Sequence, residues 1–521
     1  MDKINALSKK GAEIQKDLSD EIAICECTGE FTLPDYLPEI RKIIKIDSKA
    51  IPSGKFIGGS KAEFAGIVAY TVIYSDSDGK LAATSLSSEY EFSSNLPQNE
   101  ISDMAVVACT GIENTVCRLS GPRKLTLRST LKSRIHIYAR CVVNEITDDS
   151  ANLESLTENV LTCRTICAAS EEFNLLDEYE IDGISSDSLH VNYVLAELLV
   201  REARCGSDCI NCRGDALIKC NCSCEDGEPF TVTKKIPFER SLNADGAMNS
   251  DSCISYGRCN SASVSISENG AGGSILNFDI SAELEGECVR NENTGIICDL
   301  YSTEYECSAV YKDVAFIESL GTAMGNYSID AQRPKTEDEF DVSSIIDSFG
   351  KAEVKEVFQK DGRVYVVGEC KIELLTSSSH GDICEYSNSP LVIPFKIEPD
   401  LRITSDSARF DCHAELVSSR GRLDGSTIGA DAEVFVTLRA TKTVTKRLID
   451  NVTLNEGEKK EKCADKITVV YPESSDTLFS IAKKYKVGYK ELAELNGLPE
   501  GSIDAPAEKC SLNGVKLLLI P

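Results

Sequence analysis

Residues 64–80 read FAGIVAYTVIYSDSDGK and alternate apolar residues with small or polar ones. This alternation predicts a β-strand with one buried face, because successive side chains of a strand point to opposite sides of its sheet. The predicted inward face is made by Val68, Tyr70, Val72 and Tyr74. A glycine follows the run at position 79, where we expect the chain to turn.

The same pattern occurs twice more, as CRGDALIKCNCSCEDGE at 212–228 and VVGECKIELLTSSSHGD at 366–382. Each copy has a glycine two residues after its start, and the two new copies predict the same alternation of inward and outward side chains. The first glycines of the three copies are Gly66, Gly214 and Gly368. The inward residues of the new copies are Ala216, Ile218, Cys220 and Cys222, and Cys370, Ile372, Leu374 and Thr376.

Each copy continues with a strand around a phenylalanine (Phe92, Phe238 or Phe395) and closes on a long alternating strand. A repeat of this length is a whole domain. We therefore expect a mainly β fold, with three tandem β-sandwich-like repeats followed by a small βααβ domain. The expected boundaries are residues 1–28 for an N-terminal segment, 29–145, 165–300 and 335–452 for the repeats, and 466–521 for the last domain.

Two further features concern the segments between these units. Apolar residues at helical spacing predict a short amphipathic helix over residues 3–18. Residues 145–170 and 310–335 have the composition of linkers between repeats, although they could also pack against them.

The composition bounds the possible partners. The 521 residues carry a formal net charge of −29, which disfavours binding to nucleic acid or to an anionic membrane surface. The first thirty residues contain no apolar run of signal-peptide length, and no run elsewhere approaches a membrane span. We therefore expect a protein of the cytoplasm that is not inserted into a membrane.

The 23 cysteines fit reduced thiols in the cytoplasm. Cys212, Cys220 and Cys222 occupy positions that are mostly apolar in the other copies, which predicts that they pack in a core. Cys205 and Cys209, together with Cys212, leave open the alternative of a zinc-binding thiolate cluster, but the spacing lacks paired C-x₂-C motifs. The role of Cys224 stays open.

No catalytic motif is present. The four histidines belong to no metal or nucleophile pattern, and the chain lacks a phosphate-binding loop and a nucleophile elbow. The glycine-rich NGAGGS at 269–274 fits a turn. We therefore expect a protein that is not an enzyme and that needs no cofactor.

Residues 467–521 predict the order β-α-α-β. Ser475 or Asp476 can cap the first helix, because each offers an oxygen to free backbone N–H groups. The second helix, YKELAELNG, places Leu492 and Leu495 inward and ends at Gly497.

The motifs SDTLFSIAKKYKV, ELAELNG and NGVKLLLIP of this segment closely resemble a LysM domain. The resemblance implies binding of N-acetylglucosamine polymers such as peptidoglycan, in a groove between the loop after the first strand and the loop after the second helix. The implied groove residues are Ser475, Asp476, Thr477, Leu478, Asn496, Gly497 and Leu498. The chain departs from the family at Ser475, where glycine is usual, and in the longer loop after residue 498.

The opening GEFTLPDYLPEIRKIIKID at 29–47 resembles the SipL-like family of clostridial spore-coat morphogenetic proteins, and the repeats are similar to that family's SPOCS domains. The resemblance implies a scaffold that acts in the mother cell at the forespore surface. It also implies that the LysM domain binds a protein, the coat ATPase called stage IV sporulation protein A. Two other kinds of function stay open: a wall protein that binds peptidoglycan through its LysM domain, and an enzyme or a thiol or metal protein.

Overall fold

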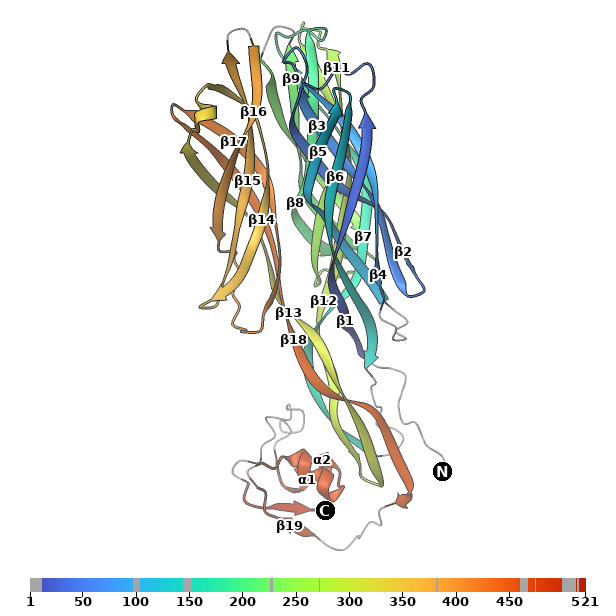
Figure 1. The fold of residues 1–521 in the computed structure, drawn as a ribbon. Coiled ribbons are helices and arrows are strands. Elements are labelled where there is room, and N and C mark those ends of the chain that lie inside the picture. Colours follow the sequence, from blue (N-terminus) through green and yellow to red (C-terminus); the bar gives the residue numbers. More distant parts are fainter. Residues whose placement is uncertain are drawn as a thin grey trace.

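The computed structural model describes residues 12–96, 104–143, 152–224, 228–270, 272–380, 383–459, 467–473, 475–498, 512 and 515–521. These residues form three β-sandwiches and a small C-terminal domain with two helices, so the fold is mainly β as expected (Figure 1). Each sandwich consists of two antiparallel three-stranded sheets. In the described part of the chain, no helix has the length and apolar character that a membrane crossing requires.

The sheets have the same strand order in every repeat: a meander of the second, third and fourth strands faces a sheet of the first, sixth and fifth. Repeat 1 contains β1 (Ala12–Thr32), β2 (Lys42–Gly58), β3 (Lys61–Ser75), β4 (Leu81–Asn95), β5 (Met104–Gly121) and β6 (Lys124–Val143). Repeat 2 contains β7 (Leu153–Ile181), β8 (Leu189–Gly206), β9 (Cys209–Cys224), β10 (Phe230–Asn243), β11 (Ser252–Glu268) and β12 (Ser274–Ser302). Repeat 3 contains β13 (Tyr305–Pro334), β14 (Val342–Lys360), β15 (Arg363–His380), β16 (Ile383–Ile397), β17 (Arg409–Asp424) and β18 (Thr427–Lys459).

The three quoted stretches are the central strands β3, β9 and β15, and their predicted inward faces are confirmed. All twelve inward side chains are buried, among them Cys220, Cys222 and Thr376. Each face packs into the core of its own repeat. The alternation of apolar and polar residues in these strands therefore predicts correctly which side chains are buried. A one-residue shift in register would expose the apolar face to water.

The first glycine of each copy lies opposite a β-bulge in the neighbouring strand. A Cβ atom at Gly66, Gly214 or Gly368 would lie 2.5, 2.0 or 2.4 Å from a backbone carbonyl oxygen of that bulge. On the other side, an aromatic ring covers the glycine in every repeat: Tyr90, Phe238 or Phe395. Glycine occurs here because the two backbones approach too closely for any side chain.

The alignment of Phe92 with the phenylalanines of the other copies is wrong. Tyr90 is the residue opposite Gly66, whereas Phe92 pairs with Phe64 and stacks on it with ring centroids 4.9 Å apart. The two aromatic residues lie on the same face of β4, two positions apart, so the period-two pattern alone could not distinguish them.

The helix expected over residues 3–18 is wrong for residues 12–18, which open strand β1, and residues 1–11 lie outside the described part. Strand β1 pairs with β6 along its length, and Ile14 is buried. The hydrogen bonds to β6, together with the burial of Ile14, outweigh the weak helical preference of a short segment. The described parts of the two linker-like stretches likewise form β-structure, since β7 begins at Leu153 and β13 continues to Pro334. Residues 145–151 lie outside the described part.

Strands β7, β12, β13 and β18 run past the sandwiches and form a narrow stalk (Figure 1). The stalk comprises residues 153–163, 291–302, 305–316 and 444–459 of these strands. One cluster of its buried side chains consists of Leu153, Leu300, Ile449, Val452 and Leu454. The stalk joins repeats 2 and 3 and leads towards the C-terminal domain.

An ion pair stabilises the turn between β13 and β14 of repeat 3. A single 3-10 turn, η2 (Glu337–Glu339), buries Glu339, whose carboxylate accepts hydrogen bonds from Arg333 at 2.6 and 2.7 Å and from the Thr336 N–H at 2.9 Å. The bonds from Arg333 hold the pKa of the Glu339 carboxyl well below its ordinary value. The carboxylate therefore stabilises the folded state fully above the ordinary pKa of about 4.3, and this stabilisation is lost as the pH falls further.

We expect Glu339→Gln to lower the free energy of unfolding of repeat 3 by about 2 kcal/mol at pH 7. The loss should be smaller at pH 3, where the unfolded chain already binds the proton. Urea unfolding at both pH values, followed by amide exchange in β14, measures the difference. Glu337→Gln, an exposed change in the same turn, is the control, and an equal effect of the two variants would contradict the prediction.

Candidate functional site

The C-terminal domain has the expected order: β19 (Thr468–Val470), α1 (Leu478–Tyr485), α2 (Tyr489–Leu495) and β20 (Leu518–Ile520). Strands β19 and β20 pair antiparallel. The two helices pack over one face of this small sheet, around a core that includes Leu478, Ile481 and Leu492. Leu478, an implied groove residue, is therefore a core residue with 1% of its surface exposed.

Thr477 caps the first helix, so the assignment of this role to Ser475 or Asp476 is wrong. The Ser480 N–H donates to Thr477 Oγ1 at 3.1 Å, and the Thr477 N–H donates to Ser480 Oγ at 3.0 Å. Asp476 instead accepts a hydrogen bond from the Glu473 N–H at 2.9 Å and closes the preceding turn. Ser475 is exposed. The loop before α1 is thus ordered by its own polar side chains.

Gly497 ends the second helix as expected, with φ at +62°. The Leu498 N–H donates to the Ala493 carbonyl at 3.0 Å, and the Gly497 N–H donates to the Glu494 carbonyl at 3.1 Å. These two bonds form a Schellman motif, which favours glycine at the left-handed position. Leu498 is partly buried against the domain core.

Asn496 joins the second helix to the last strand. Its amide donates to the Leu492 and Leu519 carbonyls, both at 2.8 Å, and its Oδ1 accepts from the Leu519 N–H at 2.7 Å. All three bonds are internal to the domain, so Asn496 positions the groove loop and β20 rather than offering its amide to a ligand.

We expect Asn496→Ala to destabilise the C-terminal domain by about 2–3 kcal/mol, because it leaves partly buried backbone groups without partners. Amide exchange in α2 and β20 measures this loss. Ser475→Ala, on the opposite groove loop, is the control and should change exchange little. If Asn496→Ala left the exchange rates unaltered, the bridging role would be refuted.

The outer face of the small sheet is apolar, and no described residue covers it. Ile467, Val469, Tyr471 and Leu517 expose 67%, 49%, 75% and 47% of their surface. Leu495 is also 42% exposed, so its expected inward position is wrong, because α2 ends before that side chain reaches the core. We call Ile467, Val469, Tyr471 and Leu517 the sheet-face patch.

The stalk holds the C-terminal domain through α1 and the turn between the helices (Figure 1). The Tyr301 hydroxyl donates to the Val487 carbonyl at 2.8 Å, and its ring meets Phe479 edge-on with centroids 5.3 Å apart. Lys483 pairs with Asp299 at 2.5 Å. These stalk residues could not be predicted from the sequence, since Asp299 and Tyr301 lie on β12, far from the domain along the chain and in no recognisable motif.

The cysteines of the proposed zinc cluster do not converge. Cys205 donates to Cys288 at 3.6 Å, and Cys212 donates to Ser255 at 3.3 Å. Cys209 instead accepts from Asn211 at 3.7 Å. The alternative of a shared zinc site is wrong for these three thiols, because Cys209 and Cys212 lie three positions apart on β9 and so point to opposite faces of their sheet, and Cys205 and Cys212 bond to different neighbours. Among all described residues, no group of three or more His, Cys, Asp or Glu side chains is arranged to hold a metal ion.

Burial also raises the pKa of the Cys205 thiol to about 12 and that of Cys253 to about 11. Both groups are therefore protonated at neutral pH, and a protonated thiol is a poor nucleophile. Cys212, Cys220 and Cys222 are completely buried in the core of repeat 2, which confirms their packing role. Cys224 ends β9 and is partly buried.

Comparison with known families agrees with this geometry: residues 473–505 match the LysM domain family. No curated protein sequence matches the chain. The match and the βααβ order show that the chain carries a C-terminal LysM domain, a module that binds peptidoglycan, other carbohydrates or proteins. In class, the chain is a multi-domain β-protein that ends in a binding module.

Proposed function

We propose that this chain is a non-enzymatic scaffold of sporulation that tethers the spore coat to the forespore surface. It acts in the mother-cell cytoplasm and binds the coat ATPase, stage IV sporulation protein A, through its LysM domain. The resemblance of residues 29–47 and of the repeats to SipL-like proteins supports this function and this partner.

One structural observation supports a protein partner in particular, namely the sheet-face patch. The stalk contacts the helical side of the LysM domain and leaves the apolar face of its sheet open. Exposed apolar residues that include a tyrosine are typical of the centre of protein interfaces.

A pull-down with the full-length chain tests the proposal, with the purified coat ATPase and purified sacculi as separate baits. We expect the ATPase to be retained and Val469→Asp to reduce its retention at least tenfold, since the substitution places a charge in the patch. Val116→Asp, at an exposed valine of β5 in repeat 1, is the matched control and should bind like the unaltered chain. Absence of ATPase retention by the unaltered chain would overturn the proposal.

Binding of peptidoglycan is the second candidate function. The polar and ring contacts with the stalk come from α1, the turn after it and the first residue of α2, so the loops at Ser475 and Gly497 stay exposed and open to a glycan. In this case sacculi should be retained, and Ser475→Arg should reduce their retention while Val469→Asp should not. That result would favour the wall-binding function over the scaffold function.

A further inference from the structure

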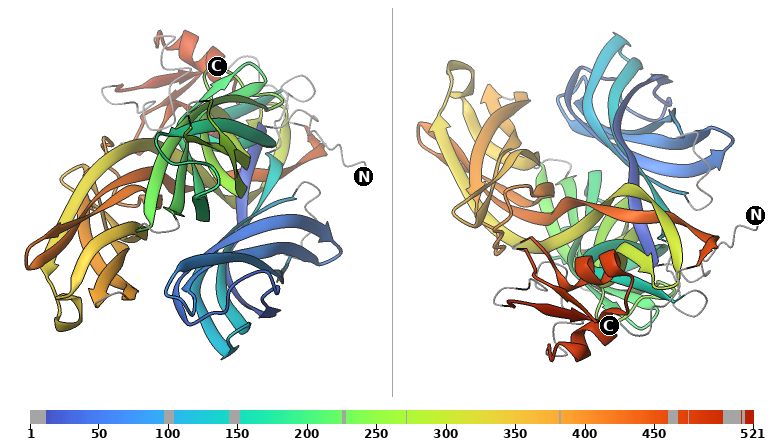
Figure 2. Two further views of the ribbon diagram at one scale, coloured as in Figure 1. Left: turned by 90° about the horizontal axis from the view of Figure 1, so that it is seen from above. Right: turned by 90° about the horizontal axis from the view of Figure 1, so that it is seen from below.

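Residues at equivalent positions of the three repeats line one cavity between them. Pro52, Val200 and Val354 lie opposite the repeat glycines in the bulged strands β2, β8 and β14. Three positions before these residues stand Lys49, Glu197 and Lys351. All three line the same cavity. The three sandwiches that supply them lie beside one another (Figure 2). The three repeats therefore form an approximately threefold site. Repeats 1 and 3 each contribute a positive charge (Lys49 and Lys351), and repeat 2 contributes a negative one (Glu197).

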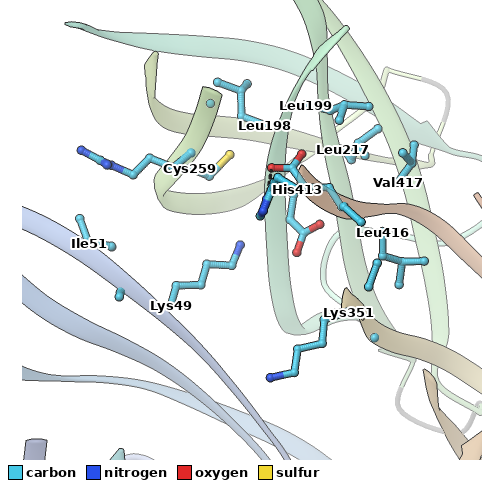
Figure 3. A pocket seen from close by; sticks show the side chains of 18 residues that line it. Lys49, Ile51, Leu198, Leu199, Leu217, Cys259, Lys351, His413, Leu416 and Val417 are labelled. Carbon is cyan, nitrogen blue, oxygen red and sulfur yellow. Dashed lines mark hydrogen bonds and ion pairs between the residues drawn. The ribbon is translucent and has the colours of Figure 1, made fainter. Parts of the chain in front are cut away.

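The cavity has a volume of about 410 Å³, which lies within the range of small-molecule sites. One wall is apolar and is formed by Leu198, Leu199, Leu217, Leu416 and Val417 (Figure 3). The Lys49 side chain reaches in from the opposite wall (Figure 3). The site thus combines an apolar wall with charged side chains, as sites for amphipathic ligands do.

The charged groups keep unused hydrogen-bonding capacity. The Lys49 ammonium donates to the Ala196 carbonyl at 2.6 Å, which leaves two of its three donors free. Among the described residues, the Glu197 carboxylate and the Lys351 ammonium have no hydrogen-bond partner within reach. Burial alone would lower the pKa of Lys49, but the Glu197 and Asp47 carboxylates outweigh it and raise the pKa.

The other charged side chains of the cavity are already paired. His413 lies 3.2 Å from Glu415, and this contact raises the pKa of the imidazole. Arg258 pairs with Glu283 at 2.6 Å and with Glu285 at 2.9 Å. Two lysines and one glutamate therefore remain to recognise a ligand. Glu197 and Lys351 are both exposed at the open cavity, so the ammonium and carboxylate groups of a ligand can reach them.

We propose that this cavity binds a small zwitterion with an apolar side chain, of the class of free aliphatic α-amino acids. Glu197 accepts hydrogen bonds from the ligand ammonium group. Lys49 and Lys351 donate to its carboxylate, and Leu198 and Leu416 contact its side chain. Because each repeat supplies one of the three charges, the ligand also links the repeats.

Calorimetric titration of the full-length chain with L-leucine tests the proposal. We expect saturation at one site. L-Leucinamide lacks the carboxylate and 4-methylpentanoate lacks the ammonium group, so each should bind at least tenfold more weakly than leucine. A titration without saturable heat would identify the cavity as a hydrated gap between repeats and overturn the proposal. Equal binding of leucine and both analogues would overturn it as well.

Substitutions then assign the binding to the cavity. Glu197→Gln and Lys351→Met should each weaken leucine binding at least tenfold, with unchanged thermal unfolding. Glu113→Gln and Lys132→Met replace exposed residues of repeat 1 and serve as matched controls. If leucine bound the two cavity variants as tightly as the unaltered chain, the ligand would lie elsewhere and the proposal would fail. Retention of the ATPase is an independent readout, because the sheet-face patch lies on the LysM domain.

Discussion

Replacing Gly214 by valine is expected to unfold repeat 2. A Cβ atom at this position would lie 2.0 Å from the Leu199 carbonyl oxygen and 2.8 Å from the Phe238 ring. The ring can turn, but the carbonyl belongs to the bulge of β8, whose backbone is held by its hydrogen bonds to β9. Valine therefore forces the central strand β9 away from its neighbour, and we expect a loss of more than about 3 kcal/mol in the free energy of unfolding.

Urea unfolding followed by amide exchange in β8–β10 measures this loss within repeat 2. The exchange readout is needed because a chain of several domains does not unfold in one step. Gly111→Val is the matched control: Gly111 also lies inside a strand, but a Cβ there meets no atom within 4 Å. Similar protection of β9 in the two variants would show that the close approach at Gly214 can relax, against our prediction.

The second large effect is expected at Tyr301, the stalk residue that holds the LysM domain. Tyr301 is only 3% exposed and contacts Phe479 and the Val487 carbonyl of that domain. Tyr301→Ala removes the ring and the hydrogen bond together, which should weaken docking by about 3–5 kcal/mol. Lys483 and Asp299 remain paired, but a partly exposed ion pair contributes only about 0–1 kcal/mol. We therefore expect the LysM domain to detach from the stalk and move independently.

Small-angle scattering and proteolysis of the full-length chain measure this release, as a larger radius of gyration and faster cleavage between repeat 3 and the LysM domain. Tyr301→Phe keeps the ring and loses only the hydrogen bond, at a cost of about 1 kcal/mol, so it should stay docked. A compact, protected Tyr301→Ala variant would show that the docking does not depend on this residue.

Much of the fold could be predicted from short-range patterns. The alternation in the three central strands predicted the buried faces correctly, including the cysteines of repeat 2. A strand with one buried face has only one register that buries its apolar side chains. The order of the LysM domain and its end at Gly497 followed from local signals for the same reason, since helix ends depend on a few neighbouring residues.

The candidate site was predicted less completely. Ser475 and Gly497 lie on exposed loops as expected, whereas Leu478 is core and Asn496 bridges α2 to β20. Sequence spacing places a residue on a loop, but it does not report whether the side chain points to solvent or to a strand that returns later in the chain. Residue Tyr301 could not be found at all, because its contacts are with residues more than 170 positions away.

The sequence by itself determined the period of every central strand, the threefold repetition and the LysM domain, because each depends on residues within one short segment. Only the tertiary structure decided that residues 12–18 form a strand, that the glycines face bulges, and that Lys49, Glu197 and Lys351 share one cavity. The physical reason is the same in each case. Backbone hydrogen bonds and close contacts between distant strands set these features, and their energy exceeds any local preference.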